Sequence, residues 1–257
     1  MSIWGKIIGG AAGFAIGGPI GAIIGAVAGH HVVDKNREQQ QVGYDNTTRQ
    51  AAFTTAIIVL SAKMAKADGV VTRDEVDAFK TIFHIPQQDM AAVGKIFDEA
   101  KLSAEGYEPY AEQIGQMFRH EPQVLEELIG ALFHIAKADG VVHANEMQFM
   151  HRVALLFGFS DRDFERLKAI YLGGGAGAGG GRATGPSSGP DPYEIIGVDP
   201  KASDDEVKNA YRKLVRENHP DALMAKGMPE EFIEVANEKL AAINDAYDRI
   251  KKKRGLT

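Results

Sequence analysis

Apolar residues between about Gln50 and Leu172 recur at helical spacing, with no convincing run of the period-two alternation that marks a strand. Two further helical patterns lie near the C-terminus, and each carries one apolar stripe. The stripes consist of Val207, Ala210, Tyr211 and Leu214 in the first pattern, and Ala236, Leu240, Ile243, Tyr247 and Ile250 in the second. The pattern therefore predicts an all-α protein.

The two C-terminal helices are joined by a segment that begins with the residues 218–221, Asn-His-Pro-Asp. Ser203 and Glu206 form a capping box that starts the first helix. Pro220 biases the residue before it away from the α region and is expected to end that helix. Pro229 suits the first position of the second helix. These signals predict an antiparallel helical hairpin that displays a His-Pro-Asp tripeptide at its tip.

The face of the first helix opposite its apolar stripe is basic and carries Lys208, Arg212, Lys213 and Arg216. The whole segment resembles the J domain of DnaJ-type co-chaperones. Four motifs carry the resemblance in the expected order: the opening residues 191–198, the run 210–214, the tripeptide 219–221 and the run 243–247. The resemblance implies that this region, residues 191–257, engages a DnaK-type chaperone and stimulates its ATPase. The implied chaperone-binding residues are His219, Pro220, Asp221, Lys208, Tyr211, Arg212, Lys213 and Arg216.

Composition narrows the function classes. The chain has no cysteine, which excludes disulfides and thiolate metal sites, and its net charge of −6 gives no reason to expect a nucleic-acid partner. No cofactor is expected. A hydrolase that uses His219 and Asp221 as a dyad is an alternative, but no nucleophile lies nearby in the sequence and there is no phosphate-binding loop. We therefore expect a non-enzymatic regulator.

Residues 7–29 contain no charge, and the stretch is long enough to cross a bilayer, which takes about 20 residues. Glycines recur at every fourth position from Gly5 to Gly29, so a helix here would present a smooth ridge where a second helix can approach. The sequence predicts a transmembrane glycine-zipper helix within residues 1–33 and a homodimer formed through it. The dimerisation residues are Gly9, Gly13, Gly17, Gly21 and Gly25. A secretory signal cleaved after residues 26–28 and a glycine-rich tail are the alternatives.

Charges beside this stretch suggest its orientation. Lys35, Arg37 and Arg49 follow it, whereas Lys6 precedes it, and the positive-inside rule then weakly favours a cytoplasmic C-terminal bulk. The expectation is a single-pass protein with its N-terminus outside and residues 34–49 as a juxtamembrane spacer.

An internal repeat occupies the central region, residues 50–172. The sequence of residues 65–71 returns unchanged as residues 136–142, and Glu75 and Glu146 follow at the same distance. Each copy predicts a helix, an Asp-Gly turn and a second helix, with the two hairpins packed around Ile57, Leu60, Phe79, Leu132, Ile135 and Leu156.

The repeat resembles the TerB (tellurite-resistance) helical domain. The resemblance implies a possible divalent-metal site formed by Asp68, Glu75, Asp139 and Glu146. Turn formation and helix capping explain the same acidic residues, and we favour that interpretation. Nearby histidines are expected at the surface: His134, His143 and His151.

Residues 173–190 are almost all Gly, Ala, Ser and Pro and predict a flexible linker with a reach of about 20–25 Å, so the J domain should swing. The complete order of segments resembles the DjlA family of bacterial membrane-anchored co-chaperones, as do residues 1–9 and the long segment 222–229. The resemblance implies an inner-membrane protein that recruits DnaK, with envelope-stress signalling as a candidate pathway. A metal-linked TerB-type stress or sensor protein, in which the J domain is secondary, is the alternative.

Overall fold

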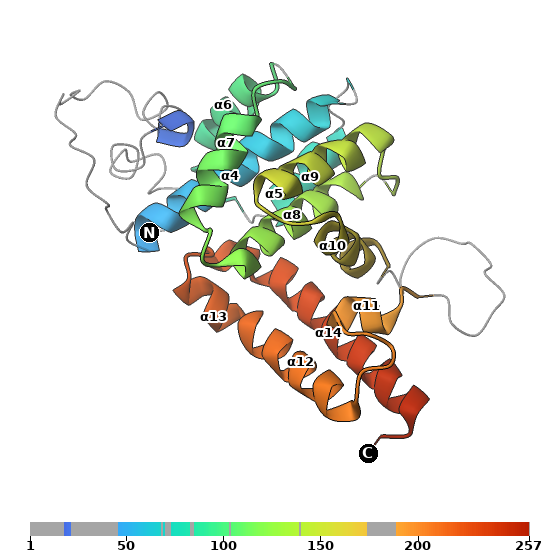
Figure 1. The fold of residues 1–257 in the computed structure, drawn as a ribbon. Helices are drawn as coiled ribbons and strands as arrows, with labels where there is room; N and C mark the ends of the chain where they lie inside the picture. Colours follow the sequence, from blue (N-terminus) through green and yellow to red (C-terminus); the bar gives the residue numbers. More distant parts are fainter. Residues whose placement is uncertain are drawn as a thin grey trace.

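A computed structural model describes residues 18–21, 46–67, 69, 73–82, 85–102, 104–138, 140–173 and 189–256. Every regular element in these ranges is a helix, and they contain no strand, so the all-α prediction is confirmed. Figure 1 shows a helical bundle and, below it, a smaller C-terminal domain whose helices lie along the bundle.

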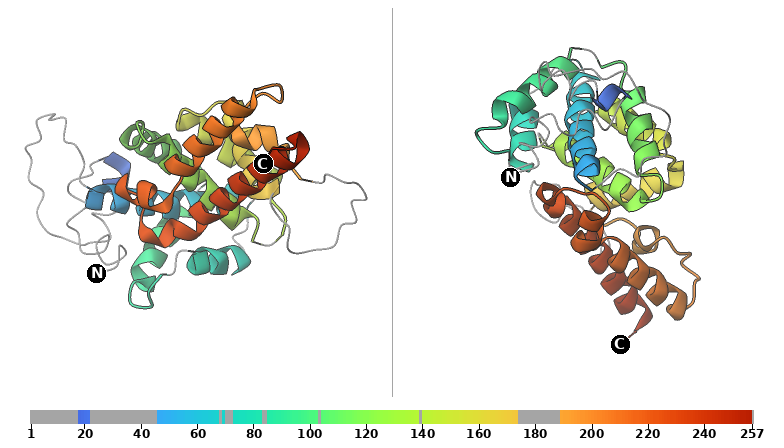
Figure 2. Two further views of the ribbon diagram at one scale, coloured as in Figure 1. Left: turned by 90° about the horizontal axis from the view of Figure 1, so that it is seen from below. Right: turned by 90° about the vertical axis from the view of Figure 1, so that its left-hand side faces the viewer.

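Within the described ranges, seven helices form the bundle: α4 (Asn46–Ala67), α5 (Arg73–Ile82), α6 (Met90–Ala100), α7 (Glu108–Met117), α8 (Pro122–Ala136), α9 (Ala144–Leu156) and α10 (Asp161–Gly173). Every residue from Ala51 to Ala65 in α4 is buried. A helix that is buried all round belongs in a core, not at a surface. Accordingly α4 contacts α6, α7, α8 and α9, and in the right-hand view of Figure 2 other helices of the bundle flank it on both sides.

The two predicted helical hairpins surround this core. Five of the six residues expected at their centre are buried, and Leu156 is half-buried against them. Gly69 and Gly140 have φ angles of 104° and 87°, in the left-handed region where glycine is strongly favoured. The Asp-Gly signal in the sequence therefore marks both turns correctly.

The C-terminal domain contains α11 (Pro192–Ile196), α12 (Asp204–Glu217), α13 (Pro220–Ala225), a 3₁₀ turn η1 (Glu230–Phe232) and α14 (Ile233–Arg254). The helices α12 and α14 lie side by side and antiparallel (Figure 1). Tyr211 of α12 stacks on Tyr247 of α14 with ring centroids 3.9 Å apart, and its hydroxyl donates to Asn244. At the far end Arg254 donates to the Tyr193 hydroxyl of α11 at 2.8 Å. The predicted hairpin is confirmed.

The segment between α12 and α14 differs from the prediction in two ways. Pro220 does not only end a helix, because it is also the first residue of α13. Its fixed φ suits a first helical turn, where the missing N–H leaves no hydrogen bond unmade. Pro229 is not the first residue of a long helix. It has extended angles and caps η1, and α14 starts only at Ile233.

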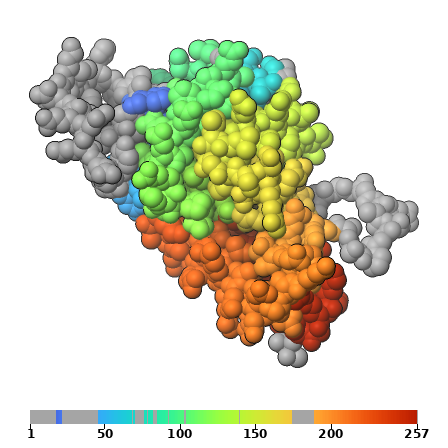
Figure 3. Space-filling view, viewed as in Figure 1, coloured from blue at the N-terminus to red at the C-terminus, as the bar shows by residue number. Residues whose placement is uncertain are grey.

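The C-terminal domain packs on the bundle through α11 and α14, which contact α10, and α14 also contacts α8. Figure 3 shows the surfaces of the two units in contact on the visible face. The predicted linker lies, except for its ends, outside the described residues, so the expected swing of the J domain stays a prediction. The described arrangement is a packed one.

Most of the predicted transmembrane stretch also lies outside the described residues, including Gly9, Gly13, Gly17 and Gly25. Residues 18–21 form one helical turn, in which Ile20 is buried and its N–H donates to Gln113 Oε1 of α7 at 3.1 Å. Among the helices that the structure describes, none combines the length and the apolar character needed to cross a membrane.

Candidate functional site

The His-Pro-Asp tripeptide lies at the start of α13 and faces solvent. His219 is the N-cap residue of α13, and its Nδ1 accepts a hydrogen bond from the Asp221 N–H at 3.2 Å. The side chains remain open, with 55% of His219 and 82% of Asp221 exposed. The backbone of the tripeptide is thus held by a helix start while its two polar side chains stay exposed to solvent.

Asn218 fixes this loop from the other side. It is the C-cap residue of α12 and is buried, and its side-chain Nδ2 donates to the Leu214 carbonyl at 2.8 Å. The Leu214 carbonyl also accepts the backbone N–H of Asn218 at 2.9 Å, so the side chain adds a second hydrogen bond at the end of α12. We did not single out this residue as functional in the sequence, although asparagine after a helical pattern is a known end signal.

The basic residues of α12 form one exposed face beside the tripeptide. Lys208, Arg212, Lys213 and Arg216 are all exposed. None of them makes an ion pair with another residue in the described part of the chain. Unpaired cations on one face create a positive potential that attracts an acidic partner surface. In Figure 3, α12 is part of the orange surface of the C-terminal domain.

Tyr211 differs from the other candidate contacts. Its ring stacks on Tyr247, and its hydroxyl donates to Asn244 at 3.0 Å. The hydrogen bond and the stacking hold α12 and α14 together. Tyr211 therefore has a clear structural role, and a contact with a partner stays a prediction for it.

The candidate metal ligands are only partly described. Asp68, Asp139 and the side chain of Glu75 lie outside the described residues. Glu146 is buried at the start of α9, where its Oε2 accepts the His143 N–H at 2.9 Å in a capping arrangement. Within the described ranges no group of three or more acidic or histidine side chains could hold a metal ion. The metal site stays a hypothesis, and for Glu146 the capping role is the observed one.

The three histidines expected at the surface have varied environments. His143 is exposed, and His151 lies with its Nε2 2.7 Å from Asp161 Oδ1. The side chain of His134 is only 20% exposed, with its Nε2 3.0 Å from Glu238 Oε1 in α14. Burial, together with the nearby Lys137, lowers the pKa of this imidazole below its ordinary value. His134 therefore belongs to the contact between the two units.

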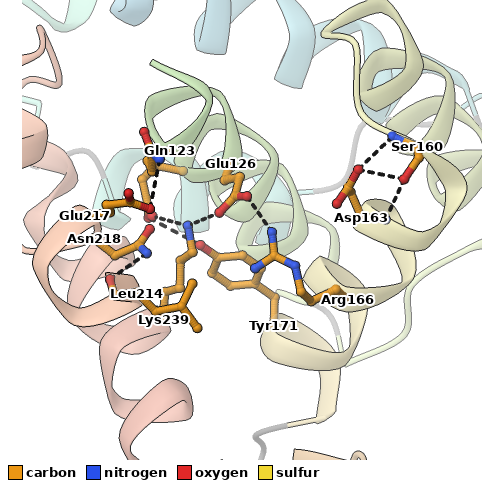
Figure 4. Close-up of polar contacts among 11 residues, drawn as sticks. Gln123, Glu126, Ser160, Asp163, Arg166, Tyr171, Leu214, Glu217, Asn218 and Lys239 are labelled. Carbon is orange, nitrogen blue, oxygen red and sulfur yellow. Dashed lines mark hydrogen bonds and ion pairs between the residues drawn. The ribbon is translucent and has the colours of Figure 1, made fainter. Parts of the chain in front are cut away.

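An ion cluster that the sequence analysis did not foresee lies at the same contact (Figure 4). Lys239 of α14 is fully buried and donates to Glu126 at 2.5 Å and to Glu127 at 2.9 Å, both on α8. Arg166 of α10 binds the other oxygen of Glu126 at 2.5 Å. The Tyr171 hydroxyl, also on α10, donates to Glu127 at 3.2 Å. We call Glu126, Glu127, Arg166 and Lys239 the interdomain ion cluster.

The cluster shifts the pKa of each carboxyl group differently. Burial would raise the pKa of Glu126, but Lys239 and Arg166 together hold it below its ordinary value. Burial dominates for Glu127 and raises its pKa despite Lys239. Burial and the two carboxylates also raise the pKa of Tyr171 well above its ordinary value, so that it stays a hydrogen-bond donor. The sequence did contain one signal, because Lys239 falls on the apolar stripe of α14, three residues after Ala236 and four before Ile243.

Comparison with known families finds three matches along the chain. Residues 191–254 match the family described as DnaJ domain, and residues 54–169 match the one described as Tellurite resistance protein TerB. Residues 1–41 match a family described as Co-chaperone DjlA transmembrane domain. The helical hairpin with its exposed tripeptide, together with these matches, defines a J-domain protein with a TerB domain.

Relatives that match over their whole length identify the family. The chain is 36% identical to the Co-chaperone protein DjlA of Vibrio cholerae and 35% identical to that of Shewanella oneidensis, over 100% of both chains in each case. It is 33% identical to that of Photobacterium profundum, over 99% of this chain and 100% of the relative. The chain belongs to the DjlA family of J-domain co-chaperones, as its motifs predicted. No solved structure matches it.

Proposed function

We propose that this co-chaperone recruits a DnaK-type chaperone through its J domain and stimulates ATP hydrolysis by that chaperone. The observation that supports the proposal most is the exposed pair His219 and Asp221, held at the tip of a rigid hairpin beside unpaired cations. In this mechanism the cations of α12 steer the chaperone to the hairpin, since complementary charge mainly raises the association rate. The tripeptide then contacts the ATP-bound chaperone, and hydrolysis takes place in the chaperone. The chain itself is a regulator and not an enzyme.

The membrane part of the proposal rests on the match of residues 1–41 to a transmembrane domain and on the uncharged stretch 7–29. The chain is anchored in the bacterial inner membrane by a single pass, with its N-terminus outside and its TerB and J domains in the cytoplasm. The glycine ridge joins two copies into a homodimer. Anchoring of this kind would bring the chaperone to clients at the membrane, including components of envelope-stress signalling.

A binding experiment with the full chain tests the recruitment step. The full chain in detergent would be immobilised and a purified DnaK-type chaperone passed over it with ATP or with ADP. We expect binding in ATP, and we expect His219→Gln to abolish it because a partner surface loses its imidazole contact. The matched control is His120→Gln, since His120 is an exposed histidine of the TerB domain.

Equal binding by wild type and His219→Gln would remove the tripeptide from the mechanism. If His120→Gln lost binding as well, the loss in His219→Gln would reflect general instability of the chain and not a lost contact of the tripeptide.

A further inference from the structure

The interdomain ion cluster joins the J domain to the TerB domain by charges and not by apolar contact alone. Lys239 is fully buried between carboxylates of α8, and Arg166 balances the second carboxylate charge (Figure 4). Burying ion pairs removes water from every charge involved, and this desolvation largely offsets their attraction. Such a contact defines one orientation of the two domains while adding little net free energy, and that combination suits docking that can reverse.

A second set of contacts connects the TerB domain to both flanks of the tripeptide. Gln123, at the start of α8, accepts from Lys226 at 3.2 Å and donates to Glu217 at 3.3 Å. Glu217 precedes His219 by two residues, and Lys226 lies just after α13. One TerB side chain therefore holds the loop at both ends.

Apolar contacts of the segment that follows the tripeptide extend the interface. Phe232 is buried, and its ring lies 4.7 Å from that of Phe53 in α4 in an edge-on arrangement. Gly227 lies so close to Arg49 and Phe118 that a Cβ there would be 2.8 Å from Arg49 Cβ. The long segment 222–229 thus also rests on the bundle, in addition to α11 and α14.

The interdomain linker is far longer than the docked arrangement needs. A Cβ on Gly173, at the end of α10, would lie 3.1 Å from Pro190 Cβ, so the two ends of the linker touch. In the sequence, the 16 residues 174–189 separate these two positions. A Gly-rich chain of this length reaches about 20–25 Å on average. The linker is therefore long enough to let the two domains separate.

We propose that the TerB domain regulates the J domain through reversible docking: the docked state restricts access of the chaperone to the tripeptide, and separation of the two domains permits it. This inference rests on the proposed function. The exposure of His219 is exposure to water, whereas a chaperone is a large body that must cover α12 and the tripeptide together. In the docked state the start of α8 stands beside that tip and holds the segments on both sides of it.

A charge reversal in the cluster tests the proposal with the full chain. Lys239→Glu places a third carboxylate beside Glu126 and Glu127, so the docked state should be lost. If docking holds about nine molecules in ten, the concentration of co-chaperone that gives half-maximal stimulation of the chaperone ATPase should fall about tenfold. The maximal stimulation should stay the same, because only the population of the competent state changes. Amide hydrogen exchange in α8 around residue 126 should become faster, which reports separation independently.

A compensating variant and a covalent lock complete the design. Lys239→Glu combined with Glu127→Lys restores an opposite pair and should return the half-maximal concentration toward the wild-type value. The chain has no cysteine, so Gly173→Cys with Pro190→Cys offers one unique disulfide. The Cβ separation of 3.1 Å needs to open only slightly to reach about 3.5–4.5 Å. The oxidised form should need a higher concentration than wild type for half-maximal stimulation, and reduction should reverse this.

The outcomes separate this inference from the proposed function. If wild type does not stimulate the chaperone, the proposed function fails. If wild type stimulates but Lys239→Glu exchanges faster in α8 without a lower half-maximal concentration, reversible docking does not regulate access. Weaker stimulation by a folded Lys239→Glu would mean that the docked form is the active one. Should that variant fail to fold, an oxidised lock with unchanged stimulation would overturn the proposal.

Discussion

Gly130→Ala is the substitution whose effect on stability the structure defines most clearly. Gly130 lies in α8 where α10 crosses it, and a Cβ there would be 2.7 Å from Tyr171 Cε1 and closer still to the Cζ and hydroxyl oxygen. Ordinary contacts of this type are at least about 3.4 Å, so the ring would have to move, and its hydrogen bond to Glu127 would be lost. Forced overpacking costs about 1–3 kcal/mol, and a hydrogen bond to a charged group contributes about 1.5–3 kcal/mol.

Alanine itself offsets part of this cost, because it favours a helix over glycine by about 0.5–1 kcal/mol. The net loss of unfolding free energy should be about 1.5–5.5 kcal/mol. At about 2–4 °C per kcal/mol for a chain of this size, the thermal midpoint should fall by roughly 3–22 °C. Thermal unfolding of the full chain followed by circular dichroism measures it.

Gly94→Ala in α6 is the matched control. No atom lies within 4 Å of the added methyl group, so only the gain in helix propensity remains and the midpoint should rise slightly. The same chemical change should therefore have opposite signs at the two positions. A midpoint that is unchanged or higher for Gly130→Ala would show that Tyr171 does not pack on α8 as described.

Three further predictions concern charge, the membrane and pH. The double variant Arg212→Glu, Arg216→Glu should associate with the chaperone more slowly than wild type in surface plasmon resonance. Wild-type binding should also weaken as salt is added, because exposed charges are screened over about 8 Å at physiological ionic strength. An affinity that does not depend on salt would contradict this. Replacing Gly17 and Gly21 by Leu should reduce self-association in a membrane dimerisation reporter, because the larger side chains on the glycine ridge keep two helices apart. Insertion into the membrane, measured as resistance to alkali extraction, should persist. An undiminished dimer signal would mean that the glycine spacing does not mediate dimerisation. The buried imidazole of His134 has a lowered pKa in the folded chain, so the unfolded chain binds more protons below about pH 6.5, and stability should fall as the pH drops through that value. Urea unfolding of His134→Gln should show a weaker pH dependence, and an equal slope would refute the assignment.

Local patterns were enough to predict the helices and the tripeptide. Helical periodicity and a capping box at Ser203 and Glu206 act within a few residues, and the structure shows both hydrogen bonds of that box. The repeated Asp-Gly turns were also readable, because Gly69 and Gly140 need a backbone conformation that few other residues adopt.

Proline signals were ambiguous in the segment after the tripeptide. Pro220 ends one helix because its ring disfavours the α conformation of the residue before it, and it begins another because its fixed φ suits a first helical turn. Pro229 has extended angles because η1 follows it, with Phe232 of that turn seated against α4. That seating depends on a contact far away in the sequence, which no local pattern contains.

The interdomain contacts could not be predicted for the same reason. Lys239 and Glu127 are 112 residues apart in the sequence, and each alone looks like a surface charge. The composition of residues 173–190 predicted a swinging J domain, whereas the charges that hold the docked arrangement come from helices on either side of the linker. A lysine on an otherwise apolar stripe was the one visible clue.

The central claim is that the tripeptide of this chain makes a DnaK-type chaperone hydrolyse ATP. Single-turnover hydrolysis by a chaperone preloaded with ATP, measured against rising concentrations of the full chain in vesicles, tests it most directly. The rate constant should rise to a plateau with wild type and stay at the basal value with His219→Gln. An identical rise with His219→Gln, or no rise with wild type, would contradict the account.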